Sequence, residues 1–140
     1  MLNICAEKFQ KILDKNEIIY NTDFDTDGNP VFQVRFLQDT LFFLTFSGED
    51  GTDLLIECVF QKIPENKVLE IIVYCTILNR KLPWLTFFVT PEHYLFVRIS
   101  TLLNTADNPD EHTLSLALYM AETLNKYSSL IQDVIDKGIQ

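Results

Sequence analysis

The sequence predicts an α+β fold, in which one curved antiparallel β-sheet packs against helices in the order α-β-β-β-β-α-β-β-α. Apolar residues recur at three- and four-residue steps in residues 2–15 and 109–137, which predicts an amphipathic helix near each end of the chain. Between these helices, short runs of strand-forming residues alternate with turn residues, as is typical of antiparallel neighbours. A length of 140 residues suits one domain, which we expect to span residues 1–140.

The first helix leads into a predicted meander of four strands. These strands cover residues 18–24, 31–37, 41–46 and 54–60, with a turn at Gln38-Asp39-Thr40 between the second and the third. The turn before the second strand contains Asp27-Gly28, which is a strong hairpin signal. In the second strand, Phe32 and Val34 face one side of the predicted sheet and Gln33 faces the other. The third strand is apolar on both faces, which predicts a central position in the sheet.

Residues 64–79 are predicted to form the second helix, and this segment is apolar nearly all round. Pro64 suits the first helical turn, because a backbone N–H there would have no partner within the helix. Arg80 and Lys81 complement the negative C-terminal end of the helix dipole. The many β-branched side chains favour a strand, but the segment is too long for a typical one. The length therefore decides for a helix.

Two strand-like runs follow, residues 84–89 and 94–102, joined by the turn Thr90-Pro91-Glu92-His93. One face of this predicted hairpin is apolar on both strands and carries Leu85, Phe87, Val89, Leu95, Val97 and Ile99. The other face is aromatic and carries Trp84, Phe88, Tyr94 and Phe96. A sheet that helices cover on one side needs one apolar face, so the second apolar face is unexpected.

The last helix, residues 109–137, has a clear start signal. Asn108 is placed as the N-cap, Pro109 occupies the first helical position, and Glu111 is placed to complete a pairing like a capping box.

The charge and the cysteines limit the classes of protein. A net charge of −9 and a pI of about 4.5 oppose binding to nucleic acid or to anionic membrane surfaces, which require clustered Lys and Arg. We expect no membrane span, because no run of residues approaches the about 18 apolar residues that one requires. The N-terminus shows neither the basic region nor the apolar run of a signal peptide.

Cys5, Cys58 and Cys75 include no CxxC pair and predict buried, reduced thiols, hence a cytoplasmic protein.

The segment Asp23-Phe24-Asp25-Thr26-Asp27-Gly28 reproduces the first half of an EF-hand calcium loop. The second half does not follow, because Val34 stands where a bidentate glutamate is required and Pro30 interrupts the loop. We interpret the segment as a polar β-turn and expect no metal site. Weak calcium binding by Asp23, Asp25 and Asp27 is the alternative.

No set of residues in the sequence points to a reaction or a cofactor. His93 and His112 are the only histidines, and neither stands within a few residues of a cysteine. The glycines are scattered, so no loop resembles a phosphate cradle. We therefore predict a protein without enzymatic activity and assign no catalytic residue and no cofactor.

The surplus of apolar residues predicts a contact surface for another protein. A helix over a sheet normally has a polar face, so the second helix is either buried on both sides within the chain or covered by a second chain. The aromatic hairpin face favours a partner, because large exposed apolar patches mark interaction sites. The predicted contact residues are Ile71, Tyr74, Leu78, Trp84, Phe88 and Phe96.

The segment Asn79-Arg80-Lys81-Leu82-Pro83-Trp84-Leu85-Thr86-Phe87 and the order of elements over the whole chain resemble the YbjN-like domain, whose fold is similar to that of the bacterial type III secretion chaperones. The resemblance implies a small acidic cytoplasmic protein, commonly dimeric, of a family often described as regulators. It supplies no catalytic residue. The chaperones of similar fold bind client proteins along apolar patches.

We therefore expect a protein-interaction module of the chaperone or adaptor type, homodimeric, whose partner is a protein client or a second copy of the chain. The competing hypothesis is a sensor or regulator that binds a small molecule in a pocket between the sheet and the C-terminal helix.

Overall fold

The computed structural model describes residues 2–37 and 40–139, and their elements follow the predicted order. The helices are α1 (Ile4–Lys15), α2 (Val68–Lys81) and α3 (Pro109–Lys137). The strands are β1 (Tyr20–Phe24), β2 (Pro30–Leu37), β3 (Thr40–Ser47), β4 (Asp53–Lys62), β5 (Thr86–Val89) and β6 (Tyr94–Leu102). The predicted α+β fold is confirmed. Of the turn predicted between β2 and β3, Gln38 and Asp39 lie outside the described residues.

The strands form one open sheet in the order β1-β2-β3-β4-β6-β5, and every neighbouring pair is antiparallel. The first four strands follow one another as a meander, whereas β6 pairs with β4 and leaves β5 at the edge. Phe42 of β3 lies opposite Cys58 of β4, and Cys58 lies opposite Val97 of β6. Because side chains alternate along each strand, this register aligns the apolar positions into one continuous face.

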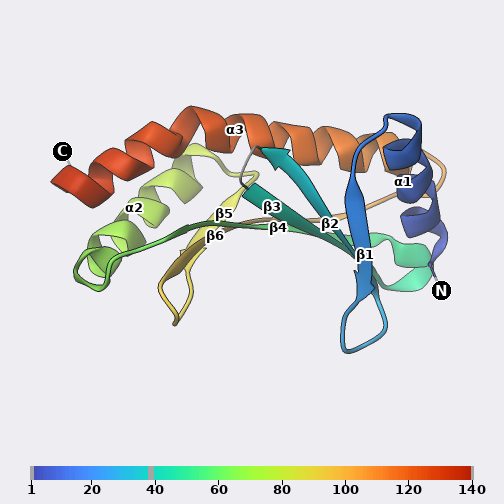
Figure 1. The fold of residues 1–140 in the computed structure, drawn as a ribbon, viewed down its shortest axis with the longest axis horizontal. Coiled ribbons are helices and arrows are strands. Elements are labelled where there is room, and N and C mark those ends of the chain that lie inside the picture. The colour runs from blue at the N-terminus through green and yellow to red at the C-terminus, as the bar shows by residue number, and fades with distance from the viewer. Residues whose placement is uncertain (1, 38–39, 140) are drawn as a thin grey trace.

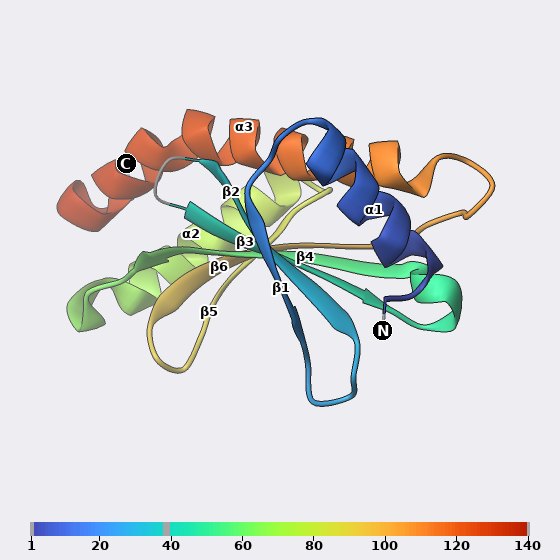
Figure 2. The same ribbon diagram turned by 45° about the vertical axis from the view of Figure 1, so that its right-hand side comes forward.

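Helices α1 and α3 cover that face, as Figures 1 and 2 show. Phe9 of α1 meets Phe32 edge to face, with 5.4 Å between the ring centroids, and Phe32 meets Phe46 in the same way at 5.7 Å. Leu124 and Ile131 of α3 are fully buried in the same cluster. The core therefore lies between these two helices and one face of the sheet, the buried side of α2 adds to it, and no described helix lies over the opposite face.

Helix α2 flanks the β5 edge of the sheet. It begins later than predicted, because a short 3-10 turn (Glu65–Lys67) follows Pro64 and the α-helix starts at Val68. Its C-terminal turn extends to Lys81 and is closed by the N–H of Leu82, which donates to the carbonyl of Leu78 at 2.8 Å. The buried side of the helix consists of Ile71, Cys75 and Leu78.

The β5–β6 hairpin pairs as predicted, with Phe87 opposite Val97 and Phe88 opposite Phe96. The outer edge of β5 is completed by a side chain of α2 instead of another strand. Asn79 Nδ2 donates to the carbonyl of Phe87 at 3.0 Å, and Asn79 Oδ1 accepts from the N–H of the same residue at 2.6 Å. One amide group thus takes the place of a neighbouring backbone at this position.

The first strand of the hairpin is shorter than predicted, since β5 begins at Thr86 and not at Trp84. The N–H of Leu85 donates to the carbonyl of Leu82 at 3.0 Å, so the chain is still turning at that point. Pro83 inside this turn has no N–H for a sheet ladder. The alternating apolar pattern continues through the turn, which is why the strand was predicted too long.

The start of α3 differs from the prediction in one detail. Pro109 occupies the first turn as predicted, but Asn108 makes no side-chain cap hydrogen bond. Its backbone is left-handed, with φ 52°, whereas a capping side chain requires an extended backbone at that residue. Asn108 is therefore the N-cap residue as predicted, but its side chain does not take part in the predicted capping-box-like pairing.

Candidate interaction surfaces

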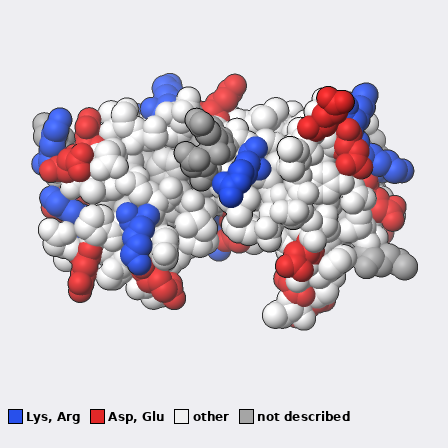
Figure 3. Space-filling model, viewed as in Figure 1, with Lys and Arg blue, Asp and Glu red and all other residues white. Residues whose placement is uncertain are grey.

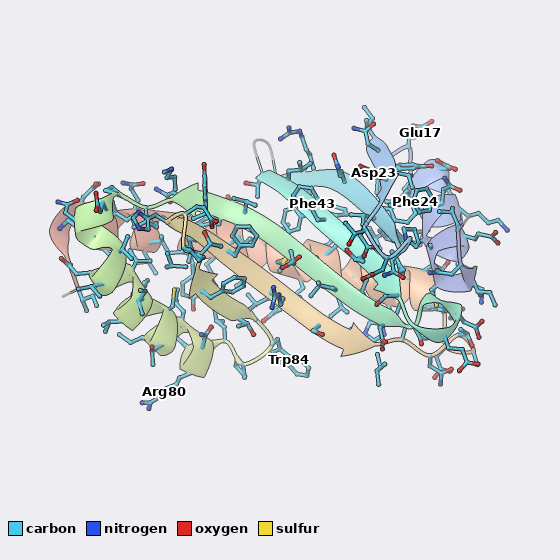
Figure 4. The ribbon with its side chains drawn as sticks, turned by 90° about the horizontal axis from the view of Figure 1, so that it is seen from below. Glu17, Asp23, Phe24, Phe43, Arg80 and Trp84 are labelled. Atoms are coloured by element: carbon cyan, nitrogen blue, oxygen red, sulfur yellow. The ribbon has the colours of Figure 1, made fainter. Side chains whose placement is uncertain are left out.

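Seven half-buried, large apolar side chains lie on the face of the sheet that α1 and α3 leave open. They are Val31, Leu41, Phe43, Leu55, Val59, Phe88 and Phe96, and each is half-buried by its neighbours. Val59 lies opposite Phe96, and Phe96 lies opposite Phe88, so the set is continuous across three strands. Figure 4 shows this side of the molecule from below, with α3 behind the strands. We call these seven residues the uncovered sheet face.

One ion pair lies within the uncovered sheet face. Arg98 donates from Nη2 to Glu57 Oε2 at 2.7 Å and from Nε to the same oxygen at 3.1 Å. The guanidinium also lies over the ring of Phe88, with 4.8 Å from Cζ to the ring centroid. Because both contacts hold the Arg98 guanidinium in place, the face has a fixed charged group among its apolar side chains.

A second apolar surface runs along the outer side of α2. Leu69, Ile72, Val73 and Ile77 are exposed at helical spacing, and the side chain of Leu69 is 79% exposed. At one end this stripe meets the C-terminal part of α3, where Ile77, Leu130 and Ile139 line one shallow surface hollow. We call the four α2 residues the α2 stripe.

The six predicted contact residues do not form one surface. Ile71 and Leu78 are each 1% exposed and belong to the core, so this part of the prediction is corrected. Tyr74 is half-buried between α2 and the end of α3, and burial raises the pKa of its hydroxyl. Trp84, in contrast, is 73% exposed on the loop before β5 (Figure 4).

The remaining two predicted residues, Phe88 and Phe96, do lie together, with 5.5 Å between their ring centroids. They form one end of the uncovered sheet face. The sequence prediction missed Leu41, Phe43 and their neighbours on the same face. The available signal was that the third strand is apolar on both sides, a pattern that we interpreted only as a central position in the sheet.

The acidic turn between β1 and β2 uses its carboxylates to hold the backbone. Asp25 Oδ1 accepts from the N–H of Asn29 at 2.9 Å and from that of Asp27 at 3.0 Å. The hydrogen bonds from Asn29 are the main reason why the pKa of Asp25 lies below its usual range. Asp23 accepts from the N–H of Phe24 at 2.8 Å. These carboxylates are directed at neighbouring amides, and acidic atoms gather at the tip of this hairpin in Figure 3.

The three cysteines are free and buried, as predicted. Burial raises the pKa of the Cys58 thiol to about 12 and that of Cys75 to about 11. Both thiols are therefore protonated at neutral pH, and a protonated thiol is a poor nucleophile and a poor metal ligand.

Among residues 2–37 and 40–139, no group of three or more His, Cys, Asp or Glu side chains is arranged to hold a metal ion. In the same part of the chain, none of the helices is both long enough and apolar enough to cross a bilayer.

Comparison with known proteins gives one family. The family model described as "Putative bacterial sensory transduction regulator" matches residues 6–126, which cover most of α1, the whole sheet, α2 and somewhat more than half of α3. No curated protein matches the chain. Because the match covers most of the sequence, the chain belongs to the YbjN family.

Proposed function

We propose that this protein is a non-enzymatic interaction module of the adaptor or chaperone type, which binds a protein client on its uncovered sheet face. The observation that carries the proposal is that the sheet has apolar side chains on both faces, while α1 and α3 cover only one. An apolar sheet face without a cover favours contact with another protein. A regulatory role, which the family description suggests, is compatible with binding of a protein partner.

Charge indicates the kind of client. The protein carries a net charge of −9, and the hairpin beside the uncovered sheet face ends in Asp25 and Asp27. A client with basic residues around an apolar segment would be attracted over a distance and then bury its apolar side chains against the sheet. The three free, buried cysteines fit the cytoplasmic location that we propose.

The proposal includes a homodimer formed through the α2 stripe. The helix has Glu70 in its first turn and Arg80 and Lys81 in its last. If two copies of α2 pack antiparallel about a two-fold axis, the acidic end of each lies beside the basic end of the other. The exposed Leu69 and Val73 would be buried in the same contact.

The function is tested by affinity capture from extract of the native organism. Phe43→Lys places a positive charge in the centre of the uncovered sheet face, and Leu118→Lys places the same charge on an exposed apolar residue of α3 as a matched control. We expect a partner that the wild type and Leu118→Lys retain and that Phe43→Lys loses. Calorimetry with the purified partner then measures the loss of affinity. If all three proteins retain the same partners, the uncovered sheet face is not the client site.

The alternative function is binding of a small molecule between the sheet and α3. A groove of about 680 Å³ lies at that place and is lined by Trp84, Ser100, His112 and Tyr119, among others. It is a groove on the surface, whereas small-molecule sites are usually enclosed. A rise in melting temperature with a metabolite, abolished by Tyr119→Ala, would support this alternative.

A further inference from the structure

One border of the sheet is only partly occupied, because β5 is shorter than β6. The four residues of β5 pair with Leu95–Arg98. Strand β6 continues to Leu102, and its last four residues pair with β4 alone, opposite Asp53–Ile56. On its other side, this end of β6 has no neighbouring strand among the described residues.

The hydrogen-bond register shows which backbone groups face the open side. In the β5–β6 turn, the N–H of Thr90 donates to the carbonyl of Tyr94 at 2.9 Å. Every second residue of a strand directs its N–H and C=O to the same side, so the even-numbered residues of β6 point towards β5. Ser100 and Leu102 lie beyond the position of Thr86, where β5 begins. They therefore direct their backbone N–H and C=O groups away from β4, to the side where no strand of the described chain lies. No described backbone group pairs with them there.

These groups face a groove formed between β6 and α3. The groove has a volume of about 680 Å³ and is lined by Pro83 and Trp84 from the loop before β5, by Ser100, and by His112, Leu116 and Tyr119 from α3. Figure 4 shows Trp84 beside β6, past the end of β5. The lining contains no Lys, Arg, Asp or Glu. The groove thus combines a free strand edge with an apolar wall.

We propose that an extended segment of a protein partner binds in this groove as an added strand alongside residues 99–102. The occupant is inferred from the hydrogen-bonding groups of this edge. The outward N–H and C=O groups of Ser100 and Leu102 lie two residues apart, which is the spacing at which another extended backbone presents its own donors and acceptors. Every second side chain of the segment would point towards Trp84, Leu116 and Tyr119, so we expect apolar residues at alternate positions. The net charge of −9 favours basic residues on either side of the segment. The inference rests on the proposed function and adds a second contact for the same client, at the edge of the sheet beyond the uncovered sheet face.

The test uses a synthetic peptide in which valine and threonine alternate between flanking lysines. Nuclear magnetic resonance of the free protein should show faster hydrogen exchange at the amides of Ser100 and Leu102 than at those of Ile99 and Thr101. Added peptide should shift the Ser100 and Leu102 amide signals in a saturable way and slow their exchange. The same peptide methylated at alternate backbone nitrogens loses donors and should bind about tenfold more weakly or worse.

Protein variants locate the site. Trp84→Ala removes an exposed wall of the groove, and Ser100→Pro removes one outward N–H at an edge position where proline is tolerated. Both should weaken peptide binding about tenfold. Ile19→Ala, which changes a side chain that is 90% exposed on the loop between α1 and β1, is the matched control and should bind normally. Since Trp84 is 73% exposed, Trp84→Ala should fold even if Ser100→Pro does not.

The inference is overturned if the peptide does not perturb Ser100 and Leu102, if the methylated peptide binds equally well, or if Trp84→Ala binds the peptide equally well. A shift of the Ser100 signal with protein concentration alone would assign the edge to a second copy of the chain and would also overturn it. The proposed function fails separately, because its test is the loss of a captured partner in Phe43→Lys.

Discussion

Asn79 holds the outer edge of β5 with one side chain, and its removal should be costly. Asn79→Ala would delete the hydrogen bonds to both backbone groups of Phe87, which are 3.0 and 2.6 Å long. We expect the free energy of unfolding to fall by about 1–3 kcal/mol, because the backbone groups left behind are partly buried. Urea denaturation measures this loss.

Asn125→Ala is the control for this prediction, since Asn125 is exposed on α3 and should change stability by less than about 0.5 kcal/mol. An equal effect of the two substitutions would contradict a special role for Asn79. The asparagine belongs to the segment by which the sequence resembles the YbjN family, so its position in that segment now has a physical reason.

At the same scale, the limits of sequence prediction are visible in α2. The sequence showed that this helix is apolar nearly all round, but periodicity cannot say which side faces the core when both sides are apolar. Ile71 and Leu78 were assigned to the contact surface and lie in the core, whereas the exposed residues are Leu69, Val73 and their neighbours. Which side of α2 faces the core depends on where β5 lies, and the pairing of distant strands fixes the position of β5.

Among the elements, α2 carries the prediction about oligomeric state. Val73→Glu should leave the fold intact, because Val73 is 54% exposed in the monomer, and it would place two like charges together in the proposed dimer. We expect the wild type to sediment at twice the monomer mass of 16.3 kDa at micromolar concentration, and Val73→Glu to sediment as a monomer.

Leu118→Glu makes the same chemical change at a residue of α3 with similar exposure and should remain a dimer. A monomeric wild type, or a Val73→Glu protein that remains dimeric, would remove the α2 stripe from the proposal.

The elements themselves were predicted well, because alternation and turn residues are local signals. The strands β2 and β6 and the helix α3 lie within about one residue of their predicted bounds. A pocket between the sheet and the last helix was the competing prediction, but the free edge of β6 beside the groove could not be predicted, because it arises from the unequal lengths of two paired strands. Leu85 continues the alternating pattern of β5 while its backbone is still in a turn, and only the hydrogen bond to Leu82 reveals this.

For the molecule as a whole, the region that matches the family model ends before the last helix does. The match stops at residue 126, within α3, while Tyr127, Ile131, Val134 and Ile135 continue the core. Truncation after Lys126 should lower the free energy of unfolding by about 6 kcal/mol or more, because burial of each large apolar side chain contributes about 1.5–3 kcal/mol. That loss is comparable to the whole stability of a small domain, which is about 5–15 kcal/mol.

Circular dichroism during urea titration should therefore show the truncated protein unfolded or close to unfolding. Truncation after Lys137 is the control and should stay folded, because the core residues of α3 end at Ile135. A stable, cooperative unfolding transition in the protein that ends at Lys126 would show that the second half of α3 is dispensable.

The stepped border formed by β5 and β6 also bears on self-association into fibrils. A fibril grows when the sheets of identical copies pair edge to edge, and this pairing requires a long, straight strand edge that every new copy can extend. Here the edge moves inward by one strand spacing, about 4.8 Å, where β5 ends, and the Asn79 amide occupies its outer part at Phe87. A short peptide can follow the open part, but a whole sheet would meet the step. This side of the molecule can therefore accept a strand without starting a polymer.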